Sequence, residues 1–181
     1  MFDLKKENIF GFKNKELNQI FEFSLYAIAL VLIPALISQQ IIVGALVNAL
    51  LISAALNHSI KRIFVLAVLP SLTVFGVGVI FGGLTSSLIL MLPFIWAGNI
   101  LICLITKRLV NNKVNYFLST LIGSITKTII LFFCALVLFE VSLVPTVFLT
   151  AFGVIQFFTA EIGAIIVWVV RRLKTAVYVR V

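Results

Sequence analysis

An apolar run of transmembrane length, FLSTLIGSITKTIILFFCALVLF (residues 117–139), carries a lysine near its middle. As a helix it extends about 34 Å, at about 1.5 Å per residue, which is enough to cross the hydrocarbon core of a bilayer. An ammonium group at that depth costs about 3 kcal/mol, so it must face the protein interior and have a partner. The side of the helix that carries Lys127 also carries Thr120, Gly123, Ser124 and Thr128. We therefore predict that this polar stripe faces the centre of a helical bundle.

Composition places the rest of the chain in the same class. Of 181 residues, 62% are hydrophobic and only 11% are charged, unlike a soluble globular domain. The apolar runs predict spans at about residues 20–37, 40–56, 60–81, 86–106, 117–139 and 145–170. We therefore expect an all-α integral membrane protein, with a six-helix domain at 20–173, a cytoplasmic or interfacial arm at 1–19 and a cytoplasmic tail at 174–181.

The net charge of +8 is distributed as a topology signal and not as a nucleic-acid-binding face. Every basic residue except Lys127 lies before the first apolar run or after the second, fourth or last run. The alternate connections contain none. Because basic loops stay on the cytoplasmic side, both termini are predicted to be inside, in a multi-pass protein of the cell membrane.

No motif for catalysis, metal binding or ATP hydrolysis is found in the sequence. Cys103 and Cys134 lie inside apolar runs without CxxC spacing, and His58 is the one histidine, so we expect no metal site and no cofactor. We interpret both cysteines as small core residues and His58 as a solvated loop residue. A serine–histidine pair, HExxH, paired aspartates and a Walker loop are all missing, so we do not expect an enzyme.

Glu161 is another charge deep inside an apolar run. Counted from the predicted cytoplasmic ends of their spans, Lys127 and Glu161 both lie about 14 to 15 Å deep. One interpretation is an ion pair that neutralises two costly charges and locks the fifth and sixth spans together. In the other, Lys127 binds an anionic or carbonyl-bearing solute, and Glu161 is the counter-ion when the site is empty. The two can hold together.

Three amide side chains lie within other spans. Asn48 is in the second span, Asn99 in the fourth and Gln156 in the sixth. A single amide in a membrane helix commonly bonds a neighbouring helix. Four polar groups from four spans, Lys127 included, favour a shared pocket.

Two motifs in these spans resemble a known family. QQIIVGALVNALL (residues 39–51) and LPFIWAGN (residues 92–99), with the lysine of the fifth span, are similar to Q-x-I-T-G-P-L-V-N-A and P-F-x-x-x-G-N. These patterns occur in a branch of the substrate-binding S components of energy-coupling factor (ECF) transporters. The resemblance covers about residues 23–173. The chain departs from the pattern at Val43, where threonine is usual, and at Ala45, where proline is usual.

The resemblance implies a subunit that captures a vitamin-like or other micronutrient solute in an outward-opening pocket. It also implies partners, namely a scaffold transmembrane subunit and two ATPase subunits, within membrane lipid and without nucleic acid. Docking on the scaffold would use small residues of the first span, Ser24, Ala27 and Ala29. The residues that the resemblance assigns to substrate binding are Gln40, Asn48, Trp96, Asn99, Lys127 and Gln156.

Two other functions fit the same residues. A stand-alone ion-coupled carrier or channel would use Lys127 and Glu161 as a charge relay. Such carriers are commonly built from internal repeats, and this sequence shows none. A structural membrane subunit would use the two charges only for assembly.

Overall fold

The computed structural model describes residues 15–178 and is all-helical over that range. It contains six helices that are long and apolar enough to cross a membrane, which confirms the predicted number of spans. The long helices are α1 Lys15–Leu36, α2 Gln40–Asn57, α3 Ile60–Val77, α5 Leu92–Asn111, α6 Tyr116–Glu140 and α8 Val154–Tyr178. The short helices are η1 Gly82–Leu84, α4 Thr85–Leu88 and α7 Val147–Phe152.

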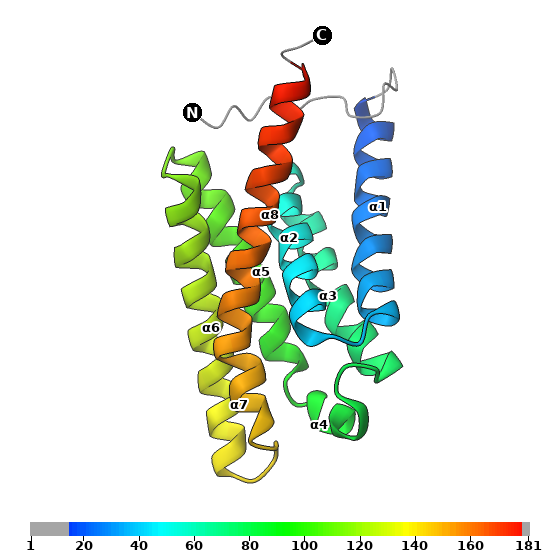
Figure 1. The fold of residues 1–181 in the computed structure, drawn as a ribbon, viewed down its shortest axis with the longest axis vertical. Helices are drawn as coiled ribbons and strands as arrows, with labels where there is room; N and C mark the ends of the chain where they lie inside the picture. The colour runs from blue at the N-terminus through cyan, green and yellow to red at the C-terminus, as the bar shows by residue number, and fades with distance from the viewer. Residues whose placement is uncertain (1–14, 179–181) are drawn as a thin grey trace.

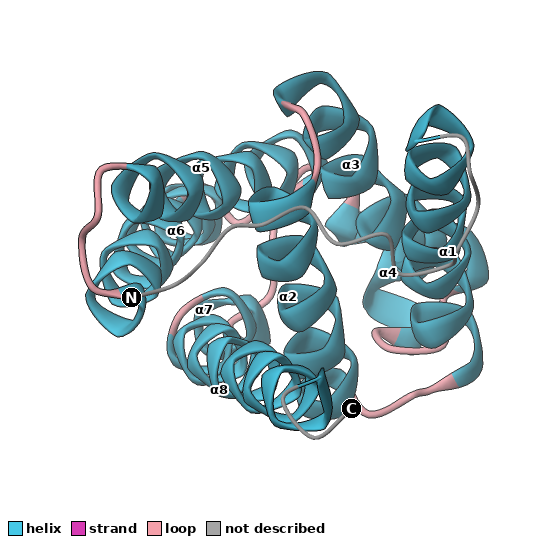
Figure 2. Cartoon of the chain, turned by 90° about the horizontal axis from the view of Figure 1, so that it is seen from above, coloured by secondary structure: helices cyan, strands magenta, loops and turns pink. Residues whose placement is uncertain are grey.

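Helix α2 is the central element of the bundle. Seen from above it lies between α8 and α3 (Figure 2), and it packs against α8, α5, α1 and α3. Helices α5 and α6 pair with each other, whereas α1 stands at the edge against α3 and α2. The main core is built around α2, with Leu51 and Ile52 fully buried against Leu66 and Ile102. A polar side chain on α2 is therefore placed to meet several other helices.

The bundle has one basic end. The first turn of α1 and the last turn of α8 lie at the same end, together with the α2–α3 and α5–α6 connections (Figure 1). The basic residues of the described chain other than Lys127 lie in these segments or in the helical turns next to them. Helices α4 and α7 lie at the opposite end (Figure 1). We call these the basic end and the opposite end.

Helix α3 ends at Val77, earlier than predicted, and α5 begins at Leu92, later than predicted. The α3 helix stops because Gly78 has φ 73°, in the left-handed region, and its N–H donates to the carbonyl of Val74. Helix α5 has Pro93 in its first turn, where a missing N–H costs no helical hydrogen bond. Pro93 therefore lies at the start of a helix and does not interrupt one.

The last span is interrupted near the opposite end. Helix α7 stops at Phe152, and Gly153 has φ −101° and ψ −105°, outside the helical region. Helix α8 then continues to Tyr178, well past the predicted boundary at residue 170. Residues 174–178, which we predicted in the tail, belong to this helix.

Two smaller expectations have different outcomes. Cys103 is fully buried, as predicted, but Cys134 is only partly buried, because it lies beside the exposed Phe133 on the outer side of α6. Residues 1–14 of the predicted arm at 1–19 lie outside the described residues. Residues 15–19 belong to α1, which begins at Lys15.

Candidate functional site

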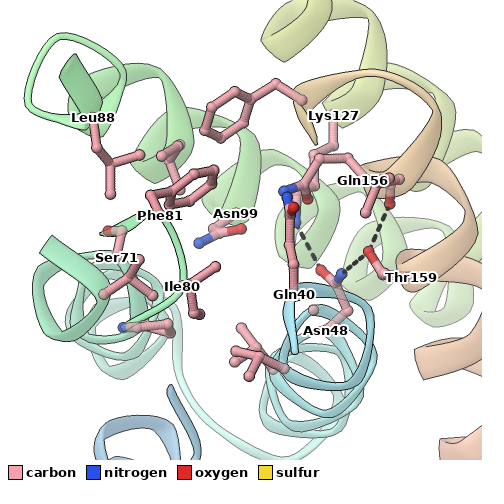
Figure 3. A pocket seen from close by; sticks show the side chains of 18 residues that line it. Gln40, Asn48, Ser71, Ile80, Phe81, Leu88, Asn99, Lys127, Gln156 and Thr159 are labelled. Atoms are coloured by element: carbon pink, nitrogen blue, oxygen red, sulfur yellow. Dashed lines mark hydrogen bonds between the residues drawn. The ribbon is translucent and has the colours of Figure 1, made fainter. Parts of the chain in front are cut away.

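A cavity of about 90 Å³ lies within the half of the bundle nearer the opposite end. Helices α2, α3, α5, α6 and α8 all contribute to its wall, together with α7 and the α3–α5 connection. Five of the six residues predicted to bind substrate line it, namely Gln40, Asn48, Asn99, Lys127 and Gln156 (Figure 3). The structure therefore brings these separated residues to one place.

Lys127 is bonded to an amide. Its side chain is 3% exposed, and its Nζ donates to Oδ1 of Asn48 at 2.7 Å. The Nδ2 of Asn48 donates to Oγ1 of Thr159 at 3.2 Å, and that hydroxyl donates to the carbonyl of Gln156 (Figure 3). This chain of hydrogen bonds connects α6, α2 and α8. It orients the lysine without neutralising its charge, because an amide oxygen carries no formal charge.

Gly98 makes room for the lysine side chain. A Cβ atom at Gly98 would lie 3.2 Å from Cγ of Lys127 and 3.3 Å from Cγ of Leu131. The absence of a side chain lets α5 approach α6 closely. The aliphatic part of Lys127 is therefore packed against α5, and its ammonium group is directed toward α2.

The other amides that line the cavity have donor or acceptor atoms that can form further hydrogen bonds. Asn99 donates from Nδ2 to the carbonyl of Ala67 at 3.0 Å, while Gln40 donates to the carbonyl of Ala151 at 3.4 Å. Within residues 15–178, the side-chain amide of Gln156 has no hydrogen-bond partner. Asn99 and Gln156 can thus offer further polar contacts to a molecule in the cavity.

Trp96 does not line the cavity, in contrast to its assignment from the resemblance. Its indole Nε1 instead donates to Oγ of Ser71 at 2.8 Å, and Ser71 is a lining residue. Sequence reasoning missed Ser71 and Thr159. Thr159 lies three residues after Gln156 on α8, so the sequence could have predicted that both side chains lie on the same face of the helix. Ser71 carried no comparable signal.

The predicted ion pair between Lys127 and Glu161 does not form. Within the described chain no carboxylate lies within 4.0 Å of Lys127, and Oε1 of Glu161 is buried without a hydrogen-bond partner. The ammonium group of Lys127 is bonded instead to Asn48, and Asn48 is bonded to Thr159 of α8. Thr159, and not Glu161, is therefore the α8 residue that this chain of hydrogen bonds joins to Lys127.

The α3–α5 connection covers one side of the cavity. Ile80, Phe81 and Leu88 from this segment point into it (Figure 3). The ring of Phe81 packs against Phe148 of α7, with ring centroids 5.4 Å apart, and stacks on Phe152. The cover is thus attached to α7 by aromatic contacts and not by backbone hydrogen bonds.

The predicted docking residues do not form one surface. Ser24 is exposed and donates to the carbonyl of Ile20, whereas Ala27 packs against the main core and Ala29 is half-buried. The exposed surface of α1 is apolar. Only 11% of the residues in its span are buried in the bundle. Its exposed large side chains are Leu17, Ile20, Phe21, Leu25, Ile28, Val31, Leu32 and Leu36.

His58 is buried, so our interpretation of it as a solvated loop residue is wrong. Its side chain is 3% exposed and lies edge-on to the rings of Phe23 and Tyr26. Its Nε2 is 4.0 Å from the carboxylate of Glu22. Helix α1 thus covers the α2–α3 turn, which sequence reasoning placed in solvent.

The cavity presents hydrogen-bonding groups on an apolar wall. The cavity holds one ammonium group, several amides and two hydroxyls on an apolar wall that includes Phe81 and Phe152. Within residues 15–178 no group of three or more histidine, cysteine, aspartate or glutamate residues could hold a metal ion. Comparison with protein-family models, with curated proteins and with solved structures finds no match to this chain.

Proposed function

We propose that this chain is a membrane-embedded substrate-capture subunit of a transporter, of the ECF S-component type. The main support for the proposal is the environment of the Lys127 side chain. Its buried ammonium group faces a cavity and is bonded to the neutral Asn48, with no carboxylate within 4.0 Å in the described chain. A buried charge without a counter-ion is costly, and a bound anion would remove that cost.

The lining supports one class of solute. An anionic or carbonyl oxygen would accept from Lys127, while the amides of Asn99 and Gln156 would bond other polar atoms. Phe81 and Phe152 would pack against an apolar or aromatic part of the same molecule. At about 90 Å³ the cavity holds only a very small solute as it stands. A vitamin-sized solute would have to displace the cover formed by the α3–α5 connection.

The charge distribution supports uptake across the cell membrane. By the positive-inside rule the basic end faces the cytoplasm, which gives the predicted N-in/C-in topology. The cavity then lies toward the outside, since Gln40 begins α2 and Phe152 ends α7 at the opposite end. The sequence contains no ATP-binding motif, so energy would come from partner ATPases through a scaffold subunit. The apolar outer face of α1 would be the surface that meets this scaffold.

The geometry weighs against the carrier alternative. A charge relay would need Lys127 and Glu161 to exchange a proton, and within the described chain no carboxylate lies within 4.0 Å of Lys127. The structural-subunit alternative predicts a different mutational result. If Lys127 served assembly alone, its replacement by an apolar residue would change stability or assembly and no ligand would be lost.

The test is mass spectrometry of the small molecules released when the gently purified protein is denatured. Lys127→Met keeps most of the side-chain volume and removes the charge. Thr126→Val is the matched control, because Thr126 is the adjacent residue on α6, does not line the cavity and bonds only the carbonyl of Ile122. We expect a stoichiometric anionic or carbonyl-bearing compound with the wild type and Thr126→Val, and none with Lys127→Met.

Melting temperatures of the three proteins complete the test. A ligand at 100 times its Kd should stabilise the folded protein by about 2.7 kcal/mol, in the wild type and the control only. A wild-type protein that releases no compound, and that no metabolite stabilises, would contradict the proposal. So would equal retention of the compound by Lys127→Met.

A further inference from the structure

The ammonium group of Lys127 keeps N–H groups without an acceptor. Its Nζ carries three N–H donors, and within residues 15–178 the one acceptor bonded to it is Oδ1 of Asn48. The side chain is 3% exposed, so its contact with bulk water is slight. A charge this deeply buried is unfavourable unless a group of opposite charge accompanies it. The protein groups around Lys127 therefore leave its charge uncompensated.

The described wall of the cavity does not balance this charge. Lys127 is the one charged residue among the described residues that line it. Glu161, another charge deep in a span, is not among these residues, and no carboxylate of the described chain lies within 4.0 Å of Lys127. A counter-ion for the ammonium group therefore has to be a separate anion.

Two amides can bind an anion together with Lys127. The side-chain amide of Gln156 bonds no other group of the described chain, so its N–H groups are available. The amide of Gln40 uses one N–H, in a hydrogen bond of 3.4 Å to the carbonyl of Ala151, and keeps the other. Figure 3 shows Gln40, Lys127 and Gln156 on one side of the cavity, opposite the apolar residues of the α3–α5 connection. One ammonium group and two amides thus offer donors on the same side.

The volume of the cavity favours a small ion. With the α3–α5 connection in place the cavity measures about 90 Å³. A water molecule takes about 30 Å³ in the liquid, and a halide ion is only somewhat larger than water. A single halide therefore fits beneath the cover. Its one negative charge matches the one positive charge of Lys127.

We propose that this cavity binds a small monovalent anion, such as chloride, when no organic solute is present. The anion accepts from Lys127, Gln40 and Gln156. An anionic solute that displaces the cover takes the place of this ion at Lys127, so the two compete. The competition rests on the proposed function, whereas the binding of the anion does not.

The test is the melting temperature of the full chain in detergent, washed until mass spectrometry detects no bound organic compound. Chloride replaces gluconate at constant ionic strength, because gluconate has the same charge and is too large for the cavity. We expect a rise that saturates with chloride, since an ion that binds only the folded state stabilises it. Arg108→Gln should keep this rise, because Arg108 is exposed on α5 and does not line the cavity.

Three variants of the wall should change the response to chloride. Lys127→Met removes the charge and should abolish the rise. Gln156→Met breaks no side-chain hydrogen bond of the described chain, and it should raise the half-saturating chloride concentration about tenfold, the loss of one hydrogen bond to a charged group. Gln156→Glu supplies a carboxylate on the same side of the cavity as Lys127, so this variant should melt at the same temperature in chloride and in gluconate. A purely structural role of Gln156 would not separate the last two variants.

A wild-type melting temperature that does not depend on chloride would overturn the proposal. So would wild-type chloride dependence in Lys127→Met or in Gln156→Glu. If Lys127→Met does not fold, the two Gln156 variants decide. The proposed function has a separate readout, the compound released when gently purified protein is denatured. Chloride dependence without a released compound supports the anion site and contradicts solute capture, and a released compound without chloride dependence does the reverse.

Discussion

The Nζ of Lys127 lies 2.7 Å from Oδ1 of Asn48, so a buried charge of the bundle is bonded to a neutral side chain. Asn48 is itself held by Thr159 of α8, and the three residues connect three helices. The amide satisfies one N–H of the ammonium group and leaves its positive charge for another molecule. This relationship links the stability of the bundle to its proposed binding role.

Replacement of Asn48 by leucine should be more damaging than replacement of Lys127 by methionine. Asn48→Leu leaves a buried ammonium without a partner, which should cost about 3 kcal/mol of unfolding free energy. Lys127→Met leaves only a neutral amide oxygen unpaired, at a cost of about 1 kcal/mol. Unfolding curves in detergent measure both values. The double variant should be more stable than Asn48→Leu alone, and the reverse order would refute this account of the pair.

Lys127 and Glu161 should behave as independent sites. Because Lys127 and Glu161 form no ion pair and share no hydrogen-bond partner within the described chain, the effects of Lys127→Met and Glu161→Gln on unfolding free energy should add to within about 0.5 kcal/mol. A double-mutant cycle measures the coupling. A coupling energy above about 1 kcal/mol would show that the two charges interact directly.

Gly163 should not accept a side chain. A Cβ there would lie 2.7 Å from the backbone nitrogen of Ala49 and 2.9 Å from the carbonyl oxygen of Ala45, and backbone atoms cannot rotate away. We expect Gly163→Ala to force α8 from α2 and to lower the unfolding free energy by about 1 to 3 kcal/mol. Gly76→Ala is the control, because no atom lies within 4 Å of a Cβ at that position. Equal effects of the two variants would contradict this prediction.

Phe81 should slow the release of the solute. Phe81→Ala removes the contacts to Phe148 and Phe152 that hold the α3–α5 connection over the cavity. We expect the dissociation rate of the bound compound to rise about tenfold, which corresponds to about 1.4 kcal/mol. Stopped-flow displacement measures this rate. The control is Phe133→Ala, at a position on α6 that is 63% exposed, and it should leave the dissociation rate unchanged. An unchanged dissociation rate in Phe81→Ala would show that the α3–α5 connection is not the cover of the cavity.

Much of the polar set could be predicted from the sequence. Asn48, Asn99, Lys127 and Gln156 are conspicuous because a polar group inside an apolar run is costly unless it faces other protein groups. Their meeting in one cavity follows from that cost. The partner of Lys127 could not be predicted, because it depends on how far α8 is displaced along its axis. Counting residues from the predicted ends of two spans paired Lys127 with Glu161, whereas the structure pairs it with Asn48.

Residues in connections were the hardest to place. Phe81 and Ile80 reach the cavity from an irregular segment, where no helical periodicity indicates which way a side chain points. His58 was assigned to solvent from its neighbours Lys61 and Arg62, yet α1 covers it. In both cases a helix distant in sequence determines the burial of the residue.

The sequence by itself determined six spans, the face of α6 that turns inward and the concentration of basic residues at one end of the bundle. These properties follow from run length, hydropathy and charge, which are local to each segment. Only the tertiary structure decided which helices touch and at what axial level, because close approaches such as that of Gly163 to Ala49 set the displacement of one helix along another. That displacement gives Lys127 an amide partner in place of an acid, and it leaves the cavity cationic.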